Sequence, residues 1–153
     1  MAYTKFTLER LYETFELQTK SEKLFDDFPW VNPSPWLVET LSSYKQMPMR
    51  TEKARSEGIV MPILNEMSSR NNRRFTIFSG FELNVDPKRG LNGETDFLFA
   101  STNELYTIKA PIFSAVEAKK QDLDLGLPQC LAQLIGAQIF NEKNNQSMVL
   151  YGC

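Results

Sequence analysis

Histidine is absent from the 153 residues, and cysteine occurs only at Cys130 and Cys153. Without histidine the chain cannot build a Ser-His-Asp triad, a Cys-His nucleophile pair or an imidazole metal site. Two cysteines are too few for a disulfide framework, which favours a reducing, cytoplasmic location. An enzyme with this sequence would depend on carboxylates, lysine and glutamine, together with a hard metal ion.

Long hydrophobic runs are also missing. No apolar stretch reaches the ~18–20 residues that a membrane-spanning helix needs. The N-terminus lacks the basic stretch and apolar core of a signal peptide. We therefore expect no membrane partner. The content of 42% hydrophobic and 24% charged residues is close to that of an average globular protein, and the length suits one domain.

The net charge of −2 argues against a protein that coats nucleic acid, but the positive charges are unevenly distributed. Between residues 70 and 89 only Glu82 and Asp86 oppose a run of basic side chains: Arg70, Arg73, Arg74, Lys88 and Arg89. A solvated loop face is the simpler explanation of such a run. The segment gains a function only if it flanks a site that holds phosphate.

The spacing of apolar residues predicts helices over about 6–25, 35–46, 51–67 and 127–142. Thr51 is expected to cap the third of these, and Pro62 to kink it. Strands are predicted over about 74–85, 95–100, 112–118 and 147–153. In the first strand one buried face is expected, with a bulge at Ser79–Gly80; this face comprises Phe75, Ile77, Phe81, Leu83 and Val85. The order predicts an α/β (α+β) fold with a central mixed β-sheet flanked by helices.

Charged residues stand at the ends of two apolar strands of this sheet. Asp96 lies near the start of one strand, and Glu117 and Lys119 end the next. Side chains at i and i+2 of a strand project from the same face, so Glu117 and Lys119 should point together. Paired hairpin strands would bring Asp96 beside Glu117. Two adjacent carboxylates repel each other, and Mg²⁺ or Mn²⁺ relieves that repulsion with oxygen ligands of this kind.

Asp96 followed by Glu117-Ala118-Lys119 resembles the signature of the PD-(D/E)XK, or restriction-endonuclease-like, nuclease superfamily. Thr95 stands where the family usually has proline. The resemblance covers residues 51–153 and implies a restriction-endonuclease-like core, with residues 1–50 as an N-terminal helical extension packed on it. The chain ends on an apolar strand without a polar tail, which is typical of a core truncated at its C-terminus.

The resemblance implies a role for each matching residue. Asp96, Glu117 and the backbone carbonyl of Ala118 would hold Mg²⁺ or Mn²⁺. Lys119 would position the attacking water, and Gln133, on the following helix, would assist. Gln129 and Gln133 both fall where some branches of the family carry a glutamine that reaches the active site or the substrate. A glutamate on the helix before the first strand would bind or bridge a second metal. Glu57 is our choice for it, with Glu52 and Glu66 as alternatives.

The function implied is metal-dependent hydrolysis of phosphodiester bonds in DNA rather than RNA. The basic segment and Lys120 would then contact backbone phosphates. A second copy of the chain, as a homodimer, or a partner protein would supply specificity. The alternative is a catalytically inactive module of the same fold that binds nucleic acid or protein. A plainer reading treats Glu117 and Lys119 as an exposed ion pair at a strand end.

Overall fold

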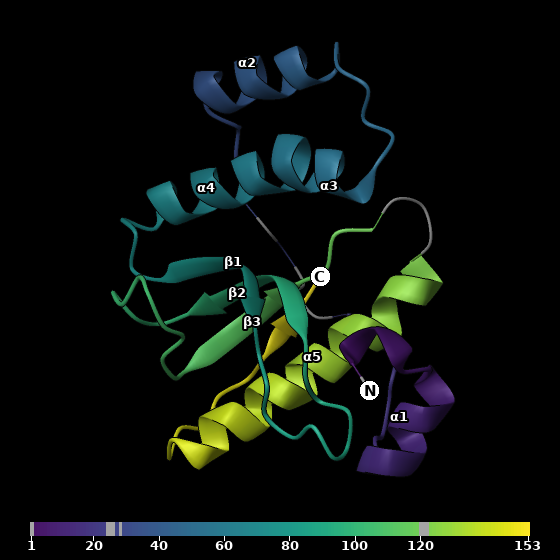
Figure 1. Cartoon of the computed structure of the whole chain (residues 1–153). Coiled ribbons are helices and arrows are strands. Elements are labelled where there is room, and N and C mark those ends of the chain that lie inside the picture. The colour runs from purple at the N-terminus through teal and green to yellow at the C-terminus, as the bar shows by residue number, and fades with distance from the viewer. Residues whose placement is uncertain (1, 24–26, 28, 120–122) are drawn as a thin grey trace.

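The fold is built around a four-stranded mixed β-sheet (Figure 1). The computed structural model describes residues 2–23, 27, 29–119 and 123–153. Strands β1 (Thr76–Glu82), β2 (Glu94–Ala100) and β3 (Ile112–Val116) pair antiparallel in sequence order. The short strand β4 (Tyr151–Gly152) lies parallel to β3. The predicted mixed sheet is therefore confirmed, although the last strand is much shorter than expected.

One long helix covers each face of the sheet. Helix α4 (Met61–Arg70) lies on one face and α5 (Leu123–Lys143), which connects β3 to β4, lies on the other (Figure 1). Leu64 of α4 packs with Phe97 and Phe99 of β2 on the α4 side. Leu98 and Ala100, the alternate residues of the same strand, pack toward α5. Both faces of β2 are apolar because both are covered.

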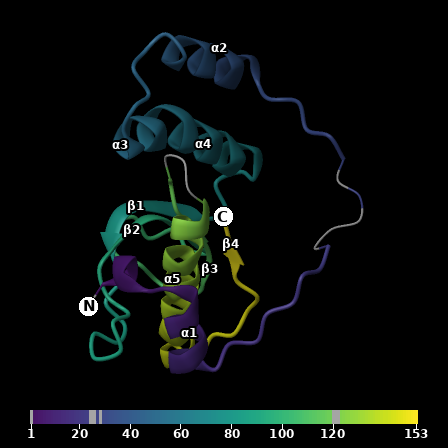
Figure 2. The ribbon, with the colours of Figure 1, turned by 90° about the vertical axis from the view of Figure 1, so that its right-hand side faces the viewer.

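The helical segments between residues 35 and 70 form a layer on one side of the sheet. Thr51 caps α3 (Glu52–Arg55) by accepting from the Ala54 N–H at 3.0 Å, as the sequence predicts. A π-helical turn, η2 (Ser56–Val60), then leads into α4. Pro62 lies just after this turn within one continuous helical run, and the π-helical turn is the irregularity that the structure shows next to the predicted kink. Helix α2 (Pro35–Tyr44), capped by Ser34, stacks on the outer side of α4 (Figure 2).

The N-terminal residues pack separately, against α5. A 3₁₀ turn, η1 (Tyr3–Lys5), buries Tyr3, whose hydroxyl donates to the Leu83 carbonyl at 2.7 Å. Helix α1 (Leu8–Phe15) follows and ends at Glu16 in the left-handed conformation. The prediction of a helix over 6–25 is therefore wrong from Glu16 to Lys23, where most side chains are polar and exposed; residues 24 and 25 lie outside the described residues.

Strand β1 changes its buried face at Gly80. Phe75 and Ile77 pack on the α4 side, whereas Phe81, Leu83 and Val85 pack on the α5 side. Gly80 has φ +69°, a conformation that other residues rarely adopt, and this local twist exchanges the two faces. The expected irregularity is present, but the prediction of one continuous buried face is wrong.

Among the described residues, no helix has the length and apolar character needed to cross a bilayer.

Candidate functional site

The pairing of β2 with β3 brings two carboxylates together at one end of the sheet. Phe97 pairs with Val116, and continuing that antiparallel register places Asp96 opposite Glu117. Residues directly opposite in such a pair have Cβ atoms about 4.5–5.5 Å apart. Asp96 Oδ2 also accepts from the Ala118 N–H at 2.7 Å, which fixes the aspartate against the end of β3. The structure thus brings together the two acids that the sequence singled out.

Both oxygens of Glu117 have partners. Oε1 lies 2.8 Å from Lys119 Nζ, and Oε2 accepts from Gln133 Nε2 of α5 at 2.8 Å. Lys119 Nζ also donates to Gln129 Oε1, one turn earlier on the same helix, at 3.1 Å. The side chain of Glu117 is only 3% exposed and that of Lys119 is 21% exposed. An exposed strand-end ion pair therefore does not describe this arrangement.

Burial opposes the charged form of both partners of this pair, but it outweighs the other interactions only at Glu117. At Glu117 desolvation and the nearby charge of Asp96 outweigh the hydrogen bonds, so the pKa of the carboxyl lies above its ordinary value. At Lys119 burial alone would lower the pKa, but the hydrogen bond and charge of Glu117 outweigh it and raise the pKa. Desolvation prevails at Glu117 and not at Lys119 because the Glu117 side chain is the more buried of the two.

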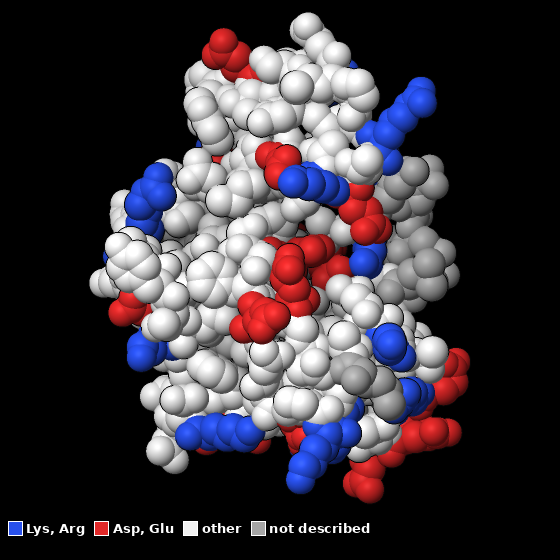
Figure 3. All heavy atoms as spheres, viewed as in Figure 1, with Lys and Arg blue, Asp and Glu red and all other residues white. Residues whose placement is uncertain are grey.

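The space around Asp96 is open toward β1. The β1–β2 register places Gly80 opposite Asp96, between the Ser79–Phe97 and Phe81–Thr95 pairs. A Cβ built on Gly80 would meet only Glu94 Oε1, at 3.5 Å. Glu94 and Glu82 are directly opposite each other in the β1–β2 register. Acidic side chains accordingly gather near the centre of the face in Figure 3, where the sheet lies between the α3–α4 layer and α5.

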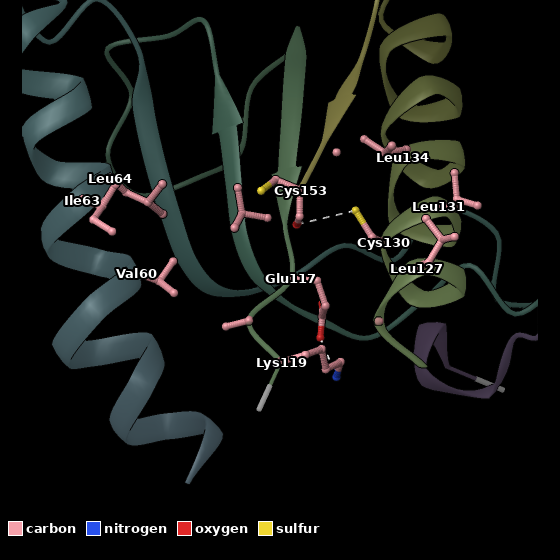
Figure 4. Close-up of a pocket in the computed structure, with 14 residues that line it drawn as sticks. Val60, Ile63, Leu64, Glu117, Lys119, Leu127, Cys130, Leu131, Leu134 and Cys153 are labelled. Carbon is pink, nitrogen blue, oxygen red and sulfur yellow. Dashed lines mark hydrogen bonds and ion pairs between the residues drawn. The ribbon is translucent and has the colours of Figure 1, made fainter. Parts of the chain in front are cut away.

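Two cavities meet at Lys119. The larger, of about 860 Å³, opens beside Glu117 and Lys119 and has mostly apolar walls. Figure 4 shows Leu64 and its neighbours from α4 on one side and Leu131 and its neighbours from α5 on the other. The smaller, of about 500 Å³, also reaches Gln129 and Glu52. The apolar walls lower the local dielectric constant on this side of Glu117, which strengthens electrostatic interactions there.

The donor set suits a hard divalent cation. Asp96 and Glu117 offer carboxylate oxygens whose mutual repulsion a cation would relieve, and oxygen ligands favour Mg²⁺ or Mn²⁺ over zinc. Gln133 Oε1 is buried and has no hydrogen-bond partner, so a further oxygen lies beside Glu117. No three acidic, cysteine or histidine residues cluster as a metal site within the described part of the chain. The Ala118 carbonyl, water or substrate would complete the coordination of an ion that usually retains waters.

The three candidate glutamates before β1 have different surroundings. Glu57 is exposed and lies 3.9 Å from Lys53. Glu66 is buried and accepts from Ser34 and Arg70, and its hydrogen bond with Ser34 lowers its pKa. Glu52 shares the smaller cavity with Lys119 and acts on it electrostatically. Of the three, Glu52 is the one that shares a cavity with Lys119, whereas our chosen Glu57 lies on the surface beside Lys53.

The predicted basic segment is not one surface. Arg73 and Arg74 are exposed where α4 leads into β1, at the end of the sheet away from Asp96. Arg70, in the last turn of α4, pairs with Glu66 at 2.8 Å and also donates to the Asn32 carbonyl.

Lys88 and Arg89 lie in the turn beyond the other end of β1, and Arg89 pairs with Asp86 at 2.6 Å. Lys143, at the C-terminal end of α5, donates to the Val85 carbonyl that leads into this turn. Lys143 is about 15 Å along α5 from Gln133. Strand β1 thus separates the two basic groups, and neither adjoins the carboxylates. Lys120 lies outside the described residues.

Of two further residues next to Lys119, Gly126 was not considered from the sequence, and Gln129 was named beside Gln133 without a role of its own. Gln129 accepts from the ammonium, and Gly126 contacts the aliphatic stem closely. Their spacing with Gln133 on one helix is the only sequence signal that could have indicated them.

No protein-family model, curated protein or solved structure matches this chain, so its assignment depends on the geometry of the site itself.

Proposed function

We propose that the chain is a metal-dependent nuclease that hydrolyses phosphodiester bonds in DNA. The observation that supports this most is the placement of Asp96 opposite a buried Glu117, with Lys119 at 2.8 Å from the same carboxylate. Glu117 is buried and Asp96 is half-buried, and two carboxylates this close are unfavourable in the absence of compensating positive charge. The arrangement is reasonable for binding a cation and is difficult to explain as a contribution to stability.

Asp96, Glu117 and the carbonyl of Ala118 would hold the cation, which when bound would polarise the phosphoryl group and lower the pKa of a water molecule. The Ala118 N–H already orients Asp96, and Gln133 already orients Glu117. Lys119 supplies the positive charge of the site. Its ammonium can hold the attacking water or stabilise charge that develops on the phosphoryl oxygens.

DNA is the substrate class we propose because the family resemblance implies it, and the carboxylate and lysine chemistry suits its phosphodiester linkage. The acidic surroundings of the site repel a polyanion, so binding should depend strongly on divalent cations. Arg70 and Arg89 are already paired within the chain, and we assign them no contact with substrate. Glu52 is the residue that we propose as the helical glutamate of the site, because it shares a cavity with Lys119.

The test is cleavage of supercoiled plasmid and of fluorescent single- and double-stranded oligonucleotides with Mg²⁺, Mn²⁺ or EDTA. Wild type should cleave at least one substrate only with a divalent cation, and Lys119→Met should reduce the rate at least a hundredfold. Lys53→Met, a change of the same kind at an exposed lysine, should retain the rate. DNA binding without cleavage under any of these conditions would contradict the proposal and favour the inactive binding module.

A further inference from the structure

Lys119 competes with any cation for Glu117. The ammonium occupies the side of the carboxylate at Oε1, while Gln133 holds Oε2. A divalent cation bound to Glu117 would face this ammonium at close range, and like charges at such a distance repel strongly beside a buried carboxylate. A cation can therefore bind Glu117 only if another group holds the Lys119 ammonium away from Oε1.

Helix α5 offers such a place through two residues. Gln129 Oε1 already accepts from Lys119 Nζ at 3.1 Å. Gly126 lies three residues earlier on the same face of the helix, against the stem of the lysine. A Cβ added at Gly126 would lie 2.8 Å from Lys119 Cγ, so only glycine leaves room for the stem in this position. Neither contact involves Glu117.

We propose that Gly126 and Gln129 form a seat on α5 that holds the ammonium of Lys119 when Glu117 exchanges its ion pair for a divalent cation. This inference rests on the proposed metal-dependent function. Gln129 acts as a positioning residue and does not touch the cation. Its role differs from that of Gln133, which holds the Glu117 carboxylate itself. The seat keeps the positive charge inside the site, close to the reacting phosphate.

The test is a double-mutant cycle on Mn²⁺ affinity, measured by calorimetry on the full chain. Gln129→Leu should weaken Mn²⁺ binding about five- to tenfold, because the lysine then has only Glu117 to pair with. Lys119→Met should tighten binding by removing the competitor. In the Lys119→Met background, Gln129→Leu should change the affinity less than twofold. Gly126→Ala provides an independent route and should weaken binding in the same direction.

Gln138→Leu is the matched control, because Gln138 lies on the same helix but is exposed and donates to Glu142. It should leave Mn²⁺ affinity unchanged, and thermal melts would verify that each variant folds. An equal loss from Gln129→Leu in both backgrounds, or no loss in either, would overturn the seat while leaving the nuclease proposal intact. Failure of the wild type to bind Mn²⁺, with or without an oligonucleotide, would overturn both.

Discussion

Replacing Lys119 with methionine isolates the electrostatic cost of the buried carboxylate. The change removes the ammonium 2.8 Å from Glu117 Oε1 but keeps an unbranched side chain of similar length. Because the Glu117 side chain is 3% exposed, water replaces the lost partner poorly, and the charge of Asp96 remains nearby. We therefore expect Lys119→Met to destabilise the fold at neutral pH.

The size of this effect follows from the contacts that are lost. Hydrogen bonds to charged groups contribute about 1.5–3 kcal/mol, and the partial exposure of Lys119 places this one at about 2 kcal/mol. For a chain of this length, that loss lowers Tm by about 4–8 °C.

The effect should depend on pH in one direction. Desolvation and Asp96 already raise the pKa of Glu117, and loss of the lysine raises it further. Below the pKa of an unfolded glutamate, about 4.3, the carboxyl is protonated in both states and has no penalty. The penalty develops as pH rises through the higher pKa of the folded state. The destabilisation by Lys119→Met should thus be largest at pH 7–8 and shrink toward pH 4–5.

Thermal unfolding followed by circular dichroism from pH 4.5 to 8 measures this directly. Lys53→Met is the control, since its pair with Glu57 is 3.9 Å long and both side chains are largely exposed. That control should change stability by less than about 0.5 kcal/mol at every pH. A Lys119→Met effect that is independent of pH, or no larger than that of the control, would refute the account of a buried, cation-dependent carboxylate.

Two further predictions concern other parts of the fold. Asn141 is buried and bonds to both the N–H (2.8 Å) and the carbonyl (2.6 Å) of Ile112, so Asn141→Leu should cost about 2–3 kcal/mol in urea unfolding, and a change below about 0.5 kcal/mol would contradict this role. Burial raises the pKa of Cys130 to about 11, whereas Cys153 is exposed. A thiol-specific reagent at pH 8 should therefore modify Cys153 rapidly and Cys130 only after denaturation; two equally fast thiols would contradict this.

The central part of the fold could be predicted because its sequence pattern is local. Strands β2 and β3 are short apolar runs bounded by turns, and α5 carries a long apolar helical repeat. The alternation of side chains along a strand sufficed to predict that Glu117 and Lys119 point together. Their common contacts with one another and with α5 confirm that prediction.

The features that were missed depend on contacts between distant residues. The irregularity at Gly80 was predicted, but the exchange of faces in β1 depends on packing of its first half toward α4 and of its second half toward α5. The Glu66 carboxylate accepts hydrogen bonds from Ser34, which is 32 residues earlier in the chain, so it is not available to the site. Glu52 and Glu57 lie on the same short stretch before α4, and only the tertiary arrangement shows which one reaches Lys119. The metal, the substrate and the activity remain predictions.

The most direct test of the central claim is calorimetric titration of Mn²⁺ into wild type, Asp96→Asn and Glu117→Gln, with and without a DNA oligonucleotide. Glu142→Gln, an exposed change near the C-terminal end of α5, is the control. We predict binding to wild type and to the control, and at least a tenfold loss of affinity in both site variants. Equal binding by all four proteins, or no binding by wild type even with DNA present, would contradict a divalent-cation site at Asp96 and Glu117.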